Sequence, residues 1–320
     1  MKLLTPPAAR RQRPADRKVA AAVALFALLA PGILVAPAFA DSKEKDPDEI
    51  GNRDVGKGVN FYSIEKEIAL GKQLAIEVER QAKMLEDPIT SEYINRLTQS
   101  LVRNSDVKFP VTIKVLDDDV VNAFTLPGGY LFVNTGMIRL SESEAELASV
   151  LSHELGHVAA RHYTRQASRA KLLTASTIPL IFLGGIPSLA AEFANVAVVP
   201  AGVMKFSRDF ETEADMLGIQ YLYKTGYDPN ASIDMFERIE AAERKHPGAV
   251  SQLFNTHPLT SDRIAKTQQN IDRNLPARPE YVVNTSEYEG VRARLVAVEG
   301  QHKAPVKTIP SLLKKPDESN

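Results

Sequence analysis

The sequence predicts an α+β fold that is mostly helical, with a small sheet set among the helices. Two observations carry this prediction. Apolar residues recur at helical spacing over much of the chain between residues 62 and 298, whereas only three short runs between 111 and 133 have the pattern of strands. A hydrophobic content of 44% and a charged content of 25% in 320 residues allow a large domain with a core of normal size.

The predicted elements follow in order along the chain. The first two helices are expected over about 62–85 and 91–103, and three strands over 111–115, 122–126 and 130–133, with a turn at Pro127-Gly128-Gly129. Later helices are expected from Ser141 to about Lys171, from about Arg208 to a stop at Gly226, and over about 231–245, 261–273 and 287–298. Ser141 and Glu144 have the form of a capping box, and residues 255–258 are expected to form a loop.

The first 40 residues have the pattern of a signal peptide. Six basic residues precede an apolar run from Val19 to about Val35, and Ala38-Phe39-Ala40 places small residues where a signal peptidase cuts. We expect cleavage after Ala40, and the alternative is an uncleaved membrane anchor. Residues 41–59 are charged and are expected to form a flexible leader, 60–275 the main domain, and 276–320 a C-terminal helix and tail.

Charge and cysteine content exclude several classes of protein. The chain has 39 basic and 40 acidic residues, and removing residues 1–40 takes away six basic and one acidic residue, which leaves 33 against 39. A net charge of −6 gives no electrostatic reason to expect nucleic acid as a partner. The absence of cysteine excludes disulfides, thiolate metal sites and a cysteine nucleophile.

The strongest chemical signal is His153-Glu154-Leu155-Gly156-His157, an HExxH motif inside a predicted helix. Residues four apart lie on one face of a helix, so His153 and His157 can bind a single zinc ion. Glu154 can then act as the general base that takes a proton from water. A chance match is the alternative, and the helical context makes it less common.

A zinc site of this type needs a third protein ligand. Glu211 and Asp215 lie four residues apart on the helix that begins near Arg208. Glu211 could bind zinc, and Asp215 could accept a hydrogen bond from the outer nitrogen of a ligating histidine. Taken alone, acidic residues at a helix start are more often a favourable dipole arrangement or a solvated face.

These motifs, in this order, resemble the CAAX-prenyl-protease-like zinc metallopeptidases, and especially their periplasmic members that act in outer-membrane quality control. The resemblance runs from about residue 60 to 275. It rests on the zinc helix extended by Ala160-Arg161-His162, and on further segments: Asn122 to Gly129, Ser207-Arg208 with Glu211 and Ala214-Asp215, Gly226 to Pro229, and Thr256-His257-Pro258 with Arg263. Each segment beyond the zinc helix is weak alone, but their order and spacing are specific.

The resemblance implies a zincin fold of the gluzincin type, with an edge strand beside the zinc helix. It implies that Glu211, rather than Glu213, is the third ligand, with one zinc ion per chain. His257 would approach the metal, as a switchable fourth ligand or near the developing oxyanion; the alternative is a surface loop histidine. Arg263 would support the oxyanion or the substrate, and the alternative is a salt bridge on the helix surface.

The same resemblance gives expectations about substrates and partners. An extended peptide would lie against the strand that contains Asn122, Ala123 and Phe124, bound through its main chain. The expected function is a zinc-dependent endopeptidase that cleaves unfolded or misassembled proteins in the periplasm, with the outer-membrane assembly machinery as a partner. Only about 45 residues follow 275, too few for the long helical-repeat domain of some relatives, which puts that kind of partner recruitment in doubt.

Residues 172–204 form an apolar stretch with a single charge, Glu192. It is long enough to cross a bilayer, but Pro179, Pro187 and Pro200 interrupt it. We expect a buried or lid segment over the active site, with peripheral membrane contact and a membrane span as the alternatives.

Two rival functions remain at this point. One is a chaperone-like protein that binds outer-membrane chains, with zinc only structural or its fourth position closed by His257. The presence of Glu154 argues against it, because a structural site needs no base. The other is a zinc hydrolase of non-peptide material, such as cell wall, which the motif alone does not exclude.

Overall fold

The computed structural model describes residues 45–182, 206–248 and 250–302. The predicted signal peptide and residues 183–204 of the apolar stretch therefore lie outside the described residues. Within these ranges, no helix combines the length and the apolar composition that crossing a membrane requires.

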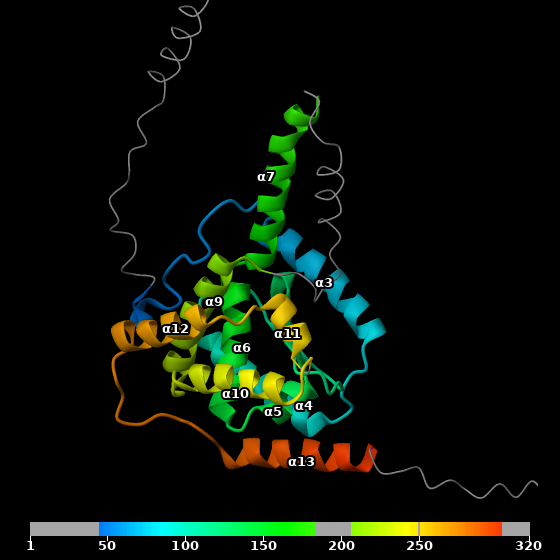
Figure 1. Cartoon of the computed structure of the whole chain (residues 1–320), viewed down its shortest axis with the longest axis vertical. Helices are drawn as coiled ribbons and strands as arrows, with labels where there is room; N and C mark the ends of the chain where they lie inside the picture. The colour runs from blue at the N-terminus through cyan, green and yellow to red at the C-terminus, as the bar shows by residue number, and fades with distance from the viewer. Residues whose placement is uncertain (1–44, 183–205, 249, 303–320) are drawn as a thin grey trace, which may run out of the picture. The chain divides into compact units, whose positions relative to one another are not determined.

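The predicted fold class is confirmed: a small sheet lies among many helices (Figure 1). The part before the zinc helix contains the 3₁₀ turn η2 (Pro47–Glu49), α3 (Ile64–Gln81), α4 (Pro88–Arg103), β1 (Thr112–Leu116), β2 (Ala123–Leu126), the 3₁₀ turn η3 (Pro127–Gly129), β3 (Tyr130–Asn134) and α5 (Thr135–Leu140). The remaining helices are α6 (Glu144–Ala159), α7 (His162–Phe182), α9 (Arg208–Thr225), α10 (Ala231–Lys245), α11 (Ser251–Thr256), α12 (Ser261–Asn274) and α13 (Ser286–His302).

The sheet has three strands in the order β1-β3-β2. β3 pairs in parallel with β1 and antiparallel with β2, so that Phe124 lies opposite Phe132, and their rings stack 5.2 Å apart. β2 therefore forms one edge of the sheet in the described part of the chain, and it packs against α6. An edge strand beside the helix of the HExxH motif is the arrangement that the family resemblance implies.

Helix α6 lies inside the core, packed against α4, α9, α10 and β2 (Figure 1). All of its residues are buried except Val150 and His153. A helix that is covered on every side is held by its neighbours rather than by its own amphipathic pattern. The ligand-bearing turn is consequently a rigid part of the molecule.

Two glycines let α6 and α9 approach closely. A Cβ atom at Gly156 would lie 2.8 Å from the carbonyl oxygen of Ala214, and one at Gly218 would lie 3.0 Å from the Cα of His153. Both distances are too short for an ordinary contact of a side-chain carbon, so a larger residue at either position would push the helices apart. The two helices that carry the predicted metal ligands thus meet backbone to backbone.

The prediction of one continuous helix from Ser141 to Lys171 is wrong. α6 ends at Ala159, and Arg161 adopts a left-handed backbone conformation with φ of 54° before α7 begins. The Arg161 side chain donates to Glu67 of α3 at 2.6 Å and to the carbonyl oxygen of Tyr62 at 2.6 Å. These tertiary bonds stabilise a conformation that few non-glycine residues adopt, and no glycine or proline marks the break.

The helix start is also corrected. Ser143, not Ser141, is the N-cap, and its hydroxyl accepts from the backbone N–H of Glu146. Glu146 reaches back to the N–H of Glu142, one residue before the cap, so a related pattern lies two residues later than predicted. Glu144 instead accepts a hydrogen bond from Tyr227, which ties α6 to the chain after α9.

Three other segments differ from expectation. α5 was not predicted, and Asn255 and Thr256, expected in a loop, belong to the short helix α11. Part of the expected flexible leader is packed: Arg53 is 4% exposed and its guanidinium binds Asp106 at 2.9 Å. A buried ion pair holds this stretch on the domain.

Candidate metal centre

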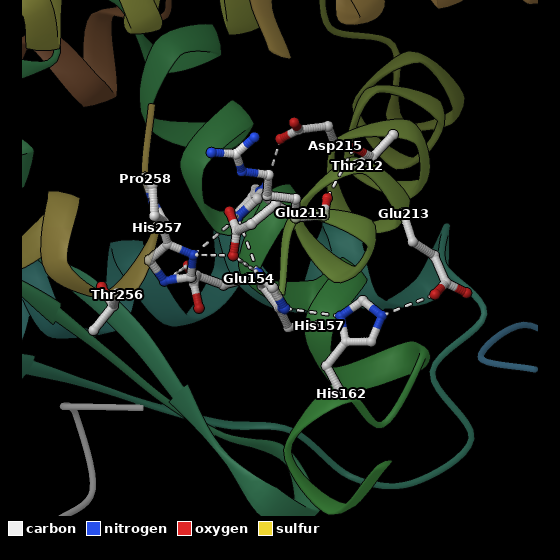
Figure 2. Close-up of polar contacts among 12 residues, drawn as sticks. Glu154, His157, His162, Glu211, Thr212, Glu213, Asp215, Thr256, His257 and Pro258 are labelled. Atoms are coloured by element: carbon white, nitrogen blue, oxygen red, sulfur yellow. Dashed lines mark hydrogen bonds and ion pairs between the residues drawn. The ribbon is translucent and has the colours of Figure 1, made fainter. Parts of the chain in front are cut away.

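Four side chains from three elements converge at one point (Figure 2). His153 and His157 come from consecutive turns of α6, Glu211 from the first turn of α9, and His257 directly follows α11. One potential ligand atom from each lies within 4.8 Å of all the others. The sequence analysis named all four residues, and the structure brings them together.

The distances within this cluster fit a tetrahedral metal ion. The Nε2 atoms of His153 and His157 are 3.1 Å apart, and Nδ1 of His257 lies 3.3 Å from Nε2 of His153. Oε1 of Glu211 lies 3.1 Å from Nδ1 of His257 and 3.5 Å from Nε2 of His157. A tetrahedron with bonds of about 2.0–2.1 Å to zinc has edges of about 3.3–3.4 Å. The donor set and its spacing therefore suit zinc.

Glu154 lies on the same turn as His153, and its carboxylate is buried at the cluster. Oε1 of Glu154 lies 3.4 Å from Nε2 of His257, and Oε2 has no hydrogen-bond partner in the described part of the chain. Burial raises the pKa of Glu154 above its usual value, against the attraction of His257 and His153. A carboxylate with a raised pKa and a free oxygen is suited to accept a proton and to give it back.

The outer nitrogen of His153 is held by a charged pair. Nδ1 of His153 lies 2.9 Å from Oδ1 of Asp215, which also accepts from Nη2 of Arg263 at 2.7 Å. Burial opposes the charge on Asp215 most strongly, but Arg263 outweighs it and lowers the pKa of Asp215. Asp215 is thus an ionised acceptor, which favours the proton on Nδ1 of His153 and leaves Nε2 free to bind a metal.

Arg263 is buried rather than on the helix surface, which corrects one of the alternatives. Its guanidinium forms a two-point bond with Asp215 and also lies 2.9 Å from Glu211 and 3.1 Å from the carbonyl oxygen of Pro258. Because its N–H groups are directed at these acceptors, Arg263 holds Glu211 and Asp215 in place. This geometry favours a positioning role over direct contact with a developing oxyanion.

The outer nitrogen of His157 has a different partner, His162, to which the sequence analysis gave no role at the metal. Nδ1 of His162 lies 2.8 Å from Nδ1 of His157, and Nε2 of His162 lies 3.0 Å from Oε2 of Glu213 (Figure 2). Glu213 also accepts from Arg165 at 3.0 Å and from the backbone N–H of Gly56 at 3.1 Å.

These contacts form a buried row of hydrogen bonds with one consistent direction. Burial lowers the pKa of both His157 and His162, so both rings are neutral. Glu213 accepts the Nε2–H of His162, so Nδ1 of His162 accepts the Nδ1–H of His157, and Nε2 of His157 is left for a metal. The rings also stack on phenylalanines: His157 on Phe206 and His162 on Phe210.

His257 and Glu211 form a coupled buried pair. Burial disfavours the charge on both residues. The carboxylates of Glu211 and Glu154 nevertheless raise the pKa of His257, and His257 lowers the pKa of Glu211. The surface-loop alternative for His257 is wrong, because this side chain is 6% exposed and lies at the fourth corner of the cluster.

The profile of peptidase family M48 matches residues 88–271, which is more than half of the chain. The chain belongs to peptidase family M48. The family resemblance that the sequence motifs indicated is confirmed.

Known proteins support the same assignment. The chain is 29% identical over 277 residues to the beta-barrel assembly-enhancing protease of Escherichia coli, covering 82% of this chain and 54% of that protein. It is 32% identical over 189 residues to the mitochondrial metalloendopeptidase OMA1 of Schizosaccharomyces pombe, covering 56% of this chain and 52% of that protein. The chain spans about half the length of these curated relatives. Family and donor cluster together confirm zinc as the predicted cofactor.

Proposed function

We propose that this protein is a zinc-dependent endopeptidase that cleaves unfolded or misassembled polypeptides in the periplasm, in envelope protein quality control. The observation that carries the proposal is the buried carboxylate of Glu154 beside a donor set that suits zinc. A structural metal site needs no base of this kind. Relatives named for the assembly of β-barrels support the proposed compartment and substrates.

We assign the metal to His153, His157 and Glu211. When bound, zinc supplies Lewis acidity toward water and a carbonyl oxygen. Glu154 takes the proton of the attacking water, holds it on its carboxylate, and delivers it to the nitrogen of the departing amine. Asp215 and His162 fix the ring orientation of the two histidines, and Arg263 fixes Asp215 and Glu211.

His257 closes the fourth corner of the donor set in the conformation described here. A water or a substrate carbonyl needs that corner, so hydrolysis requires His257 to move. We propose that His257 is an inhibitory fourth ligand in this conformation and that after moving it lies near the reacting oxygen. The chaperone-like alternative, in which His257 never leaves, rests on the same geometry, but membership in a peptidase family favours the protease.

We further propose that the substrate adds a strand to the free edge of β2. Ala123 and Phe124 use one edge of β2 to pair with β3, and the other edge has no partner strand among the described elements. Asn122, directly before β2, is 4% exposed, and its Oδ1 has no hydrogen-bond partner in the described ranges. Binding through the main chain suits extended or unfolded segments.

The test is digestion of reduced, unfolded casein by residues 41–320, with bound zinc quantified in each sample. Wild type is compared with Glu154→Gln and His257→Ala. We expect all three to hold zinc, Glu154→Gln to lose at least a hundredfold in rate, and His257→Ala to separate inhibition from assistance by the sign of its effect. If wild type and His257→Ala both hold zinc and neither cleaves casein, the result contradicts the protease and supports the chaperone-like alternative, in which the protein binds unfolded chains without hydrolysing them.

A further inference from the structure

Residues 56–62 form a strap that lies on the first two turns of α7. Three polar side chains in those turns are at most 4% exposed, and each of them binds the strap. The strap therefore supplies part of the hydrogen bonding that these buried groups need, although most of it falls in the predicted flexible leader. The bonds join Nδ2 of Asn60 to Oγ1 of Thr164 at 2.9 Å, the N–H of Phe61 to Oγ of Ser168 at 2.9 Å, and the guanidinium of Arg165 to the carbonyl oxygen of Lys57.

The strap also reaches the row of hydrogen bonds behind His157. Glu213 uses its two oxygens for different partners: Oε1 accepts the N–H of Gly56 at 3.1 Å, and Oε2 accepts from Nε2 of His162 at 3.0 Å (Figure 2). A carboxylate that is held at one oxygen only can turn, so the N–H of Gly56 fixes the orientation in which Oε2 meets His162. Arg165, itself bound to the strap, donates to the same Oε2 at 3.0 Å. The strap thus acts on Glu213 directly and through Arg165.

Position 56 needs a glycine for two reasons. Gly56 has a φ of 76°, in the left-handed region that side chains disfavour. A Cβ atom at this position would also lie 2.4 Å from the carbonyl oxygen of Ala160, two residues before His162. The strap therefore touches the backbone beside His162 as well as the carboxylate behind it.

The orientation of Glu213 decides which nitrogen of His162 carries the proton. While Oε2 accepts from Nε2, Nδ1 of His162 is free to accept the proton of His157. If Glu213 turns away, His162 can carry its proton on Nδ1, and two N–H groups would then face each other across 2.8 Å. His157 would avoid this by moving its proton to Nε2, the atom that it offers to the metal.

We propose that the strap is part of the metal site, because it holds Glu213 against His162 and thereby raises the affinity of His157 for zinc. Gly56 is the positioning residue of this arrangement. The N-terminal stretch of the domain then contributes to metal binding although it supplies no ligand. The inference rests on the assignment of zinc to His157 and not on proteolysis, so its test gives an answer whether or not casein is cleaved.

The experiment measures the zinc affinity of residues 41–320 by competition with a chromophoric chelator. Gly56→Ala is expected to bind zinc about three- to tenfold more weakly than wild type, because the strap is pushed off Glu213 and Ala160. Gly51→Ala is the matched control. Gly51 also has a positive φ, of 89°, but a Cβ atom there meets nothing within 4 Å, so zinc affinity should stay within about twofold of wild type.

Two further measurements separate positioning from a general loss of stability. Glu213→Ala removes the carboxylate through which Gly56 acts, so adding Gly56→Ala to that variant should cost no further zinc affinity. Nitrogen NMR of the histidine rings in the metal-free protein reads the tautomers. Gly56→Ala should shift His157 and His162 toward a mixture of tautomers, and Gly51→Ala should keep the wild-type signals.

The outcomes distinguish this inference from the function proposed above. Unchanged zinc affinity in Gly56→Ala, an equal loss in Gly51→Ala, or additive losses with Glu213→Ala would each overturn the role of the strap and leave the ligands as assigned. A wild type that binds no zinc would overturn the ligand assignment itself. If Gly56→Ala does not fold by circular dichroism, Asn60→Ala decides: it frees the strap from Thr164 and should weaken zinc binding about threefold, and an unchanged affinity overturns the inference.

Discussion

The two histidines of the zinc helix are chemically alike and are supported in opposite ways. His153 meets an ionised carboxylate directly, and Arg263 holds that carboxylate from behind. His157 meets a neutral ring, His162, and the carboxylate of Glu213 follows one step later. Both arrangements favour a proton on Nδ1 and a free Nε2. The charged pair of Asp215 and Arg263 achieves this for His153, and the neutral ring of His162 achieves it for His157. The comparison separates what charge contributes from what orientation contributes.

The largest effect is expected on the charged side. Asp215→Asn leaves Arg263 buried with Glu211 as its remaining charged partner, and it leaves one amide oxygen where two carboxylate oxygens accepted from Arg263 and His153. Breaking a buried pair in this way costs about 3–5 kcal/mol of folding free energy. Urea unfolding of the metal-free protein measures it.

Asp209→Asn is the matched control for that substitution, because Asp209 is an exposed residue in the first turn of the same helix, α9. It should change the free energy of unfolding by less than about 1 kcal/mol. Similar losses in the two variants would show that the pair with Arg263 does not stabilise the fold.

A smaller effect is expected on the neutral side. His162→Phe keeps a ring that can stack on Phe210 but removes the acceptor for Nδ1 of His157. Loss of such an outer partner typically lowers metal affinity about ten- to a hundredfold. Competition with a chromophoric chelator measures the affinity, with His246→Phe at an exposed position as control. An unchanged affinity would reduce His162 to a packing residue.

The smallest effect is expected at the end of the row. Glu213→Gln keeps an acceptor for His162 but removes the charge, so zinc affinity should fall less than tenfold. Burial opposes the charge of Glu213, yet His162 and Arg165 lower its pKa to about 2 from the model-compound value of 4.5. A lowered pKa in the folded state stabilises the fold above pH 4.5, and this contribution is lost as the pH falls toward 2. The difference in urea midpoint between wild type and Glu213→Gln, both metal-free, should shrink over that range; a constant difference argues against it.

How much of this site the sequence predicts depends on which bonds are local. Glu211 and Asp215 are predictable because residues four apart on one helix lie on the same face, whatever surrounds the helix. His162 was missed because its position depends on the break at Arg161, and that break is held by Glu67, 94 residues earlier in the chain. Periodicity extends a helix wherever no glycine or proline ends it, so it does not detect a tertiary break.

The fold follows the same division. Long amphipathic helices and the three strands are predictable from periodicity, whereas α5 is six residues long and too short to show a period. The parallel pairing of β1 with β3 is not predictable in this way, because the pattern of a strand does not indicate which other strand it pairs with. The sequence analysis placed Arg53 in a charged, flexible leader, because the partner that buries it, Asp106, lies 53 residues away in the chain.

The close contact of α6 and α9 gives one of the two unnamed positions of the HExxH motif a role. Gly156 touches the backbone of Ala214, three residues after Glu211, and Gly218 touches that of His153. Substituting alanine at either glycine would change no donor atom, yet it would move one ligand-bearing helix relative to the other by several tenths of an ångström. The spacing between the two helices therefore acts as the bite of a chelate, and metal preference could be tuned there without replacing a single ligand.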